Sequence, residues 1–370
     1  MANQKKLQLQ GFQFKPFSNK QMSILSFWQD NSPVADKFMI VADGSIRSGK
    51  SQPYWAKIYT PDGYKSMGDI QVGDYVLDRY GKPTKVLGIF PQGKLPVYKI
   101  TFHDGSVSYS SRDHLWTYNT VFDAEDELRT TTLGKFIDIS PEHYYKYRFP
   151  LNGCVEFAES SVTVSPYKMG LFLGCDDLAN NITYLGNQDE LYEYVLKFGC
   201  DFESRWIPSE YIYNSVEVRR KVLAGLLEAG GIVYTNTPTI QFKSSSSRLM
   251  TDITELARSL GMFVDSQNGL VFIQVDAELV EMFHEPFRKR LKLEGNILEK
   301  WRVPVSVKYY SDAECQCIYV DNDEHLYLTD DFVVTHNTVC MVLSFVLFVM
   351  THFNQQNAAM CGKMVCHSNI

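Results

Sequence analysis

The pattern of hydrophobic and polar positions changes character several times along the chain. Between about residues 51 and 150, short runs of β-branched and aromatic residues are separated by turn sequences such as PDG, VGD, YGKP, PQGK and HDGS. Turn signals this regular predict many short strands. A second stretch of this kind, ECQCIYVDNDEHLYLTDDFVVTHN, lies near the end of the chain. The pattern therefore predicts one β-rich module in two pieces.

The segment between these two pieces has a different period. Helical patterns such as VRRKVLAGLLEAGG and RLMTDITELARSLGM alternate there with short strand patterns such as TIQFKS and LVFIQV. This alternation predicts an α/β domain inserted into the β-rich module. We expect five segments with boundaries at 1–50, 51–150, 151–304, 305–337 and 338–370.

The two ends of the chain carry the halves of one motif. The apolar run KFMIVA predicts a buried strand and leads into Gly44-x4-Gly49-Lys50, the first part of a phosphate-binding loop. Strand and turn signals then replace the helix that such a loop requires. A strongly helical run, TVCMVLSFVLFVM, begins only at Thr338. Deleting residues 51–337 gives VADGSIRSGKTVCMVLSFVLF, which is a complete strand, loop and helix.

The residues at the downstream edge of this insertion carry a chemistry of their own. The side-chain amide of Asn337 can attack its own backbone carbonyl, forming a succinimide and releasing the chain that begins at Thr338. His336 can polarise that carbonyl or protonate the leaving amine, and Thr338 supplies a hydroxyl nucleophile. VVTHN followed by Thr resembles the C-terminal splice block of inteins. The resemblance implies a β-rich Hint (hedgehog/intein) splicing fold, no cofactor for splicing, and the chain's own flanks as substrate.

An upstream stretch, SVSYSSRDHLWTY, resembles the internal intein block that usually carries Thr-x-x-His. Ser111 stands where Thr is usual, and His114 is the residue that this resemblance expects to activate the first scissile bond, between Lys50 and Ser51. In the downstream block, His325 is either a second proton-transfer group or an ordinary loop histidine.

The first nucleophile has two candidates. In most inteins it is the first residue, which is Ser51 here. Trp116, Cys317 and Thr338 together resemble the signature of class 3 inteins, in which the internal Cys attacks the upstream peptide directly. We favour Cys317 because a thiolate is far more nucleophilic than a serine hydroxyl at neutral pH. Members of that class usually lack a nucleophile at the first position, so Ser51 departs from the pattern and the choice stays open.

The inserted α/β segment resembles a LAGLIDADG homing endonuclease. SPYKMGLFLGCDDL resembles its first motif helix, and RRKVLAGLLEAGG resembles its second. In that family an acidic residue at the eighth motif position binds the catalytic divalent metal. Cys175 and Gly230 occupy these positions, and neither is a hard oxygen ligand. Asp176, Asp177 and Glu228 lie nearby as an alternative ligand set, but we expect a decayed endonuclease with no metal and at most weak residual DNA binding.

The flanks FKPFSNKQMSILSFW, VADGSIRSGKT and AAMCGKMV resemble the start of a phage terminase large subunit, the ATPase that packages DNA. The resemblance implies Mg-ATP as the cofactor of the spliced host in a longer chain. The glycine loop would hold the phosphates, Lys50 would reach the β/γ oxygens, Thr338 would bind Mg²⁺ and Gln21 would sense adenine. It also implies DNA and the terminase/portal assembly as partners, in the cytoplasm of a phage-infected or prophage-carrying bacterium.

Composition adds little to this picture. A hydrophobic content of 45% indicates a globular protein, and the net charge of -7 gives no global argument for nucleic-acid binding. Eight cysteines without paired spacing and the lack of a signal peptide predict a reducing cytosol. Cys315, beside Cys317, has no second ligand pair and reads as structural. The apolar run at 339–350 is too short to span a bilayer, so we expect no membrane partner.

Two other functions stay open on the sequence alone. The middle segment could be an active site-specific endonuclease, which incubation with a DNA target and Mg²⁺ would reveal. The chain could also be a stable P-loop NTPase with an inert insert, because a Hint fold brings its own ends close together. Tight ATP binding by an unspliced chain would favour this last function.

Overall fold

The computed structural model describes residues 51–175, 205–234, 237–291 and 298–337, together with two short C-terminal strands. The chain divides into two compact units, of which one spans 49–339 and the other combines 1–48 with 340–370. In the second unit the described part is a hairpin of β18 (Ala358–Cys361) and β19 (Met364–His367). Seven predicted site residues lie outside the described ranges: Gln21, Gly44, Gly49, Lys50, Asp176, Asp177 and Thr338.

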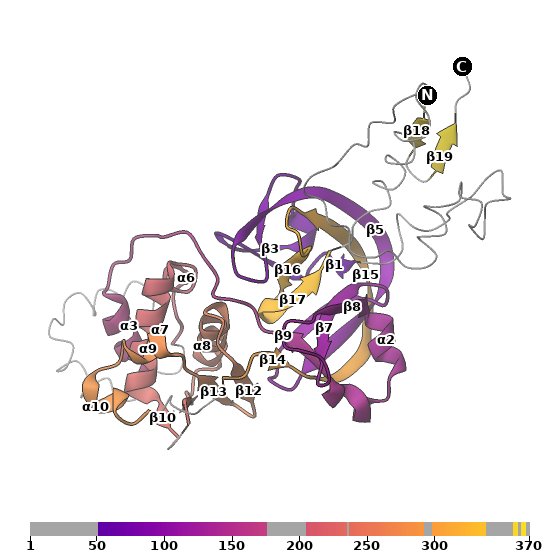
Figure 1. Cartoon of the computed structure of the whole chain (residues 1–370). Coiled ribbons are helices and arrows are strands. Elements are labelled where there is room, and N and C mark those ends of the chain that lie inside the picture. Colours follow the sequence, from indigo (N-terminus) through magenta and orange to yellow (C-terminus); the bar gives the residue numbers. More distant parts are fainter. Residues whose placement is uncertain are drawn as a thin grey trace, which may run out of the picture. The chain divides into compact units, whose positions relative to one another are not determined.

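Two long antiparallel strands organise the β-rich part, by which we mean residues 51–150 and 301–337. β5 (Pro83–Phe102) and β15 (Pro304–Val320) pair along most of their length, with several shifts of register. Such irregularities bend strands and increase their twist, and β5 follows a strongly curved path in Figure 1. Because β5 and β15 come from the two separated pieces predicted above, this pairing joins the pieces into one structure.

Shorter strands complete three sheets around this ribbon. In the first, β1 (Gln52–Pro53) pairs with β15, while β4 (Tyr75–Leu77) and β6 (Val107–Ser111) pair with β5. The second has the order β17 (Val333–His336), β16 (Leu326–Thr329), β2 (Lys57–Thr60), β3 (Gly63–Ser66). The third has the order β14 (Trp301–Arg302), β9 (Tyr147–Pro150), β7 (Leu115–Thr120), β8 (Arg129–Thr132). Four short helices are described between these strands: η1 (Met67–Asp69), α2 (Leu133–Asp138), η2 (Pro141–Lys146) and η3 (Asp330–Phe332).

The prediction of a β-rich module assembled from two pieces is confirmed by these sheets, because each contains strands from both sides of the inserted segment. β14 lies inside the range expected for the inserted domain, yet it pairs with β9. The chain therefore returns to the β-rich part by Trp301.

The middle domain, by which we mean the described residues between 151 and 300, combines helices with one small sheet. Its helices are α3 (Pro166–Gly174), α6 (Ser209–Ile212), α7 (Val216–Gly230), α8 (Ser247–Ser259), α9 (Ala277–Val280) and α10 (Glu285–Arg288). Its sheet has the order β10 (Ile232–Val233), β11 (Thr239–Phe242), β13 (Leu270–Gln274), β12 (Val264–Gln267). The predicted α/β character of the segment is thus observed.

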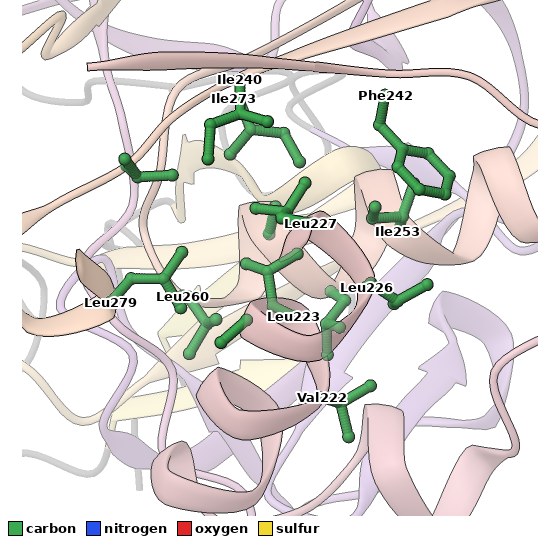
Figure 2. Close-up of a cluster of buried hydrophobic side chains, with 14 of the residues drawn as sticks. Val222, Leu223, Leu226, Leu227, Ile240, Phe242, Ile253, Leu260, Ile273 and Leu279 are labelled. Carbon is green, nitrogen blue, oxygen red and sulfur yellow. The ribbon is translucent and has the colours of Figure 1, made fainter. Parts of the chain in front are cut away.

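The core of the middle domain forms around α7. Val222, Leu223, Leu226 and Leu227 recur at helical spacing and are fully buried. Figure 2 shows these side chains among residues of the sheet and of α8, including Ile240, Ile273 and Ile253. Two smaller buried clusters lie within the described β-rich part, and one of them contains Trp116. A third joins residues of the β-rich part to Val155 and Phe157 of the middle domain. Among the helices in the described ranges, none has the length and apolar character needed to cross a membrane.

Candidate functional site

The upstream end of the predicted insertion is fixed by a pair of backbone contacts. The Ser51 N–H donates to the Ser111 hydroxyl at 3.1 Å, and the Ser51 carbonyl accepts from the Ser111 N–H at 2.9 Å. Both residues are buried. Ser111 therefore holds the residue that follows the predicted scissile bond. A threonine would offer the same hydroxyl, which explains in physical terms how Ser can stand where the resemblance expects Thr.

Strand pairing brings the internal cysteine to the same place. β1 pairs with β15 in the register Gln52 with Gln316 and Pro53 with Cys315. Ser51 directly precedes β1, and Cys317 directly follows Gln316 on β15. Residues opposite each other in such a ladder have Cα atoms about 4.5–5.5 Å apart. Cys317, which is 8% exposed, therefore lies beside the predicted upstream junction.

The Ser51 hydroxyl is buried beside a thiol rather than a base. Within the described residues, its oxygen has no hydrogen-bond partner of normal geometry. Burial raises the pKa of the neighbouring Cys315 thiol to about 11, and the Ser51 hydroxyl opposes part of that rise. A thiol with this pKa is protonated at neutral pH and unreactive. A serine nucleophile needs an adjacent base, and a protonated Cys315 thiol does not supply one.

The histidine of the upstream block contacts the downstream block directly. His114, 1% exposed, makes a hydrogen bond through Nε2 with the Thr335 hydroxyl at 2.6 Å. The ring of Trp116 meets the imidazole edge to face, with centroids 5.9 Å apart, and its indole N–H donates to the Ser110 hydroxyl at 3.2 Å. The backbone N–H of His114 donates to the Ser111 carbonyl at 3.2 Å. His114 thus links the upstream junction to β17.

At the downstream end, two histidines surround the last described residue before the junction. The His336 Nδ1 contacts the Asn337 carbonyl, and the Asn337 N–H donates to the His325 carbonyl at 2.7 Å. The two imidazole rings have centroids 6.1 Å apart. His325 adopts a left-handed backbone with φ of 56°. When the His336 Nδ1 carries a proton, it donates to the Asn337 carbonyl and polarises it.

The Asn337 side chain is buried without hydrogen bonds to the described part of the chain. The residue is 1% exposed, and neither Oδ1 nor Nδ2 has a partner there. A buried polar group left unpaired costs about 1–3 kcal/mol. Such groups are uncommon in folded proteins.

Several residues of this site were not found from the sequence. Thr335 has no signal of its own beyond its place in VVTHN. Gln52 accepts a hydrogen bond from the Tyr327 hydroxyl at 2.8 Å, and its amide donates to the Thr329 hydroxyl at 2.8 Å. Burial raises the pKa of Tyr327, and the nearby Cys317 contributes further to the rise. Only the long-range fold brings these side chains together, so no local pattern could have indicated them.

The two motif helices of the middle domain cross at their glycines. A Cβ on Gly170 would collide with the Val222 carbonyl, and a Cβ on Gly225 would collide with the Tyr167 carbonyl. The helices α3 and α7 therefore touch backbone to backbone. This packing corresponds to the two paired helices that the sequence resemblance implied.

The expected metal positions at the ends of these helices hold no carboxylate. Arg205 donates to the Cys175 carbonyl, and a Cβ on Gly230 would collide with the Gly174 carbonyl. Glu228 turns away to Tyr167 and to His284, whose Nδ1 lies 2.9 Å from the Glu228 Oε1. Within the described ranges, no cluster of three or more His, Cys, Asp or Glu side chains could hold a metal ion.

Residues 206–279 match the homing endonuclease family. The matched range runs from just before α6 to α9 and includes the second motif helix. The prediction of a homing-endonuclease segment in the middle of the chain is confirmed at this level.

The chain is also similar to a replicative DNA helicase DnaB of Mycobacterium intracellulare, with 25% identity over 352 residues. The alignment covers 78% of this chain but only 59% of that protein, so the chain spans less than two thirds of its length. Among solved structures, the MchDnaB-1 intein is 14% identical with a TM-score of 0.28, over 77% of this chain and 99% of that one. The gp41-1 intein is 13% identical with a TM-score of 0.29, over 78% and 98%.

Proposed function

We propose that this chain is an intein that excises residues 51–337 and joins Lys50 to Thr338. One observation carries the proposal: the two ends of the insertion are tied to a single buried site. Ser51 is hydrogen-bonded to Ser111 at one end, and His114 of the same block reaches Thr335, two residues before Asn337, at 2.6 Å. An inert insert needs no such histidine between its ends.

The first step in this proposal is attack of the Cys317 thiolate on the Lys50 carbonyl carbon. The Lys50–Ser51 peptide bond breaks, a thioester forms, and the leaving amine of Ser51 takes a proton from His114. The pairing of Gln52 with Gln316 supports this nucleophile, because these two residues are the chain neighbours of Ser51 and Cys317. So does the absence, within the described residues, of a base hydrogen-bonded to the Ser51 hydroxyl.

The later steps involve the downstream end. The Thr338 hydroxyl takes the acyl group from the thioester and restores the Cys317 thiol. The Asn337 amide nitrogen then attacks its own carbonyl, which His336 polarises, and the Thr338 amine leaves. The acyl group then shifts from the Thr338 hydroxyl oxygen to the Thr338 amine, which produces the Lys50–Thr338 peptide bond. The contact between the His336 Nδ1 and the Asn337 carbonyl supports the assignment of His336.

For the middle domain we propose a homing endonuclease that has lost its metal site. Cys175 and Gly230 occupy the positions where the family carries acidic ligands, and Glu228 is engaged with Tyr167 and His284. A supercoiled plasmid that carries the uninterrupted host gene should stay uncut by the protein in Mg²⁺. A linear product would show that the endonuclease is active.

For the flanks we propose a phosphate-binding loop that splicing restores, in a host resembling a phage terminase. Before splicing, Lys50 and Thr338 belong to separated halves of the motif, so the precursor should not bind Mg-ATP productively. The terminase resemblance, its DNA and portal partners, and a phage-infected bacterium as the setting rest on the flanking residues alone. A longer host chain should hydrolyse ATP after splicing and fail to do so when splicing is blocked.

Intact-mass analysis of freshly expressed protein tests the central proposal. The wild type should yield a ligated flank product and a free insert. Cys317→Ala should remain a precursor, whereas Ser51→Ala should still splice. If Ser51→Ala blocks the first step and Cys317→Ala splices, the first residue is the nucleophile. A wild type that stays at the precursor mass would refute self-processing altogether.

A further inference from the structure

The turn that leads into β17 is strained and precedes the predicted downstream site directly. Asp331 and Phe332 both adopt left-handed backbone conformations, with φ of 54° and 55°. Consecutive non-glycine residues seldom occupy this region, and they persist there only when the surroundings hold them. β17 begins at the next residue, Val333, so this turn sets where the strand starts.

The start of β17 determines which side chains face the site. The strand pairs with β16 in the register Thr329 with Val333 and Tyr327 with Thr335. A slip of one residue would turn every side chain of β17 to the other face. Thr335 would then lose His114, and the Asn337 carbonyl would leave its position at His336. The turn therefore has to be held in place for the downstream chemistry.

Two arginines hold it, and they come from different parts of the chain. Arg302, on β14, donates to the Phe332 carbonyl at 3.0 Å and to the Asp331 carbonyl at 3.3 Å. Arg258, on α8 of the middle domain, lies 3.3 Å from the Asp331 carboxylate. That carboxylate also accepts the Val107 N–H at 2.8 Å. Both arginines are almost fully buried.

A second turn of the β-rich part connects the two arginines. Arg302 forms a buried ion pair with Asp104 at 2.9 Å, and Arg258 donates to the Asp104 carbonyl at 2.9 Å. Burial alone would raise the pKa of Asp104, but Arg302 and Arg258 outweigh it and lower the pKa. Next to it, Gly105 has a φ of +78° and approaches Ser266 of β12 so closely that a Cβ would collide with the Ser266 carbonyl. The middle domain is thus fitted against both turns.

We propose that Arg258 is a positioning residue for the downstream splicing step, so that the middle domain acts as a brace for β17. This inference rests on the proposed function. It gives the middle domain a role in splicing that is independent of DNA cleavage. Cyclisation of Asn337 should depend on the brace, whereas thioester formation at Cys317 should not, because no contact of Arg258 described above reaches β1.

The test compares three variants of the full chain. Arg258→Met removes the guanidinium, Arg258→Lys keeps the charge, and Arg220→Met is the matched control. Arg220 is also a buried arginine of the middle domain, but it pairs with Asp276 and Glu278 inside that domain. Upstream cleavage is measured as the N-terminal flank that hydroxylamine releases from the thioester. Downstream cleavage is measured as release of the C-terminal flank.

We expect Arg258→Met to slow downstream cleavage about tenfold, within the range of coupling seen for residues that act through others. Upstream cleavage should stay within about twofold of wild type. Arg258→Lys should recover part of the loss, and Arg220→Met should change neither step. Wild-type rates at both junctions in Arg258→Met would overturn the proposal. Equal slowing of both steps by Arg258→Met and Arg220→Met would overturn it too, since that result indicates only general destabilisation.

A second measurement separates this inference from the proposed function. Amide hydrogen exchange is followed in a chain that also carries Cys317→Ala and Asn337→Ala, so no splicing is needed. Arg258→Met should speed exchange of the β17 amides about tenfold relative to Arg220→Met. Unchanged exchange would refute the brace even if the chain splices. A wild type that never cleaves would refute the function and leave this exchange result to decide the brace.

Discussion

In the β-rich part, side chains from two distant stretches of sequence meet in one buried site, whereas in the middle domain the motif helices meet mainly through their backbones. His114 reaches Thr335 across the first interface. At the second, Gly170 and Gly225 leave room for nothing larger than hydrogen. In the described residues of the middle domain, the glycines that this close packing demands are present, and no cluster of side chains that could hold a metal accompanies them. The comparison teaches that close helix packing in the middle domain rests on glycine backbones and does not by itself require metal-binding side chains.

The largest expected effect comes from a substitution that removes a proposed reacting group of the β-rich part and leaves the middle domain unchanged. Asn337→Ala removes the only amide that can attack the downstream scissile carbonyl from within residue 337, so release of the C-terminal flank should stop. Cys175→Ala, at the eighth position of the first endonuclease motif, serves as the control in the middle domain and should leave splicing unaffected. Intact-mass analysis over time distinguishes the two. Continued formation of ligated flanks in Asn337→Ala would show that the proposed cyclisation is wrong.

The next largest effect is on stability and comes from a substitution that disrupts the helix packing of the middle domain. Gly225→Ala forces a methyl group into the Tyr167 carbonyl, and overpacking against backbone should cost about 3 kcal/mol of unfolding free energy. Urea unfolding of a chain blocked by Cys317→Ala and Asn337→Ala measures this cost. Lys221→Ala on the same helix removes only a surface pair with Glu217 and should change stability by less than about 0.5 kcal/mol. A neutral Gly225→Ala would mean that α3 and α7 do not touch at these glycines.

A pair of partly buried carboxyls, one in each region, extends the comparison to the pH dependence of stability. Burial raises the pKa of Asp330 in the β-rich part and of Asp252 in the middle domain, each to about 6. Each accepts a backbone N–H, from Lys57 at 3.0 Å and from Ile207 at 2.9 Å. Because both pKa values lie above the unfolded value near 4, each protonated carboxyl stabilises the fold fully below about pH 4. That contribution is lost as the pH rises through about 6.

Asparagine variants test this pH dependence in the splicing-blocked chain. Asp330→Asn should remove roughly 2 kcal/mol of the fall in unfolding free energy between pH 4 and 7. Asp252→Asn should change the pH profile in the same direction, because its pKa is raised to a similar value. Urea unfolding at the two pH values provides the measurement. If neither variant flattens the pH profile, the pKa of neither carboxyl is raised in the folded chain.

The sequence indicated the elements of this molecule better than the contacts of its site. Turn spacing predicted the strands, and the split glycine loop predicted an insertion that resembles an intein. The partners of the reacting groups could not be predicted, because the 2.8 Å hydrogen bond between Tyr327 and Gln52 joins residues that have no common local pattern. The left-handed backbone at Phe332 was equally hidden, since a bulky residue there gives no turn signal. The roles of Cys317, Asn337 and His336 stay predictions.

The smallest expected effect concerns the hydroxyl that links the two blocks. Thr335→Val keeps the shape of the side chain but takes the 2.6 Å hydrogen bond away from the buried His114 Nε2. An unsatisfied buried group costs about 1–3 kcal/mol, so upstream cleavage should slow by about tenfold if His114 needs this bond to be oriented. Thr335→Ser retains the hydroxyl and should cleave at close to the wild-type rate. Because both variants conserve β17, equal rates in Thr335→Val, Thr335→Ser and wild type would mean that the hydrogen bond only fills a buried space. A defect confined to Thr335→Val would instead show that the imidazole works through its contact with the downstream strand, and that the two ends of the insertion react as one site.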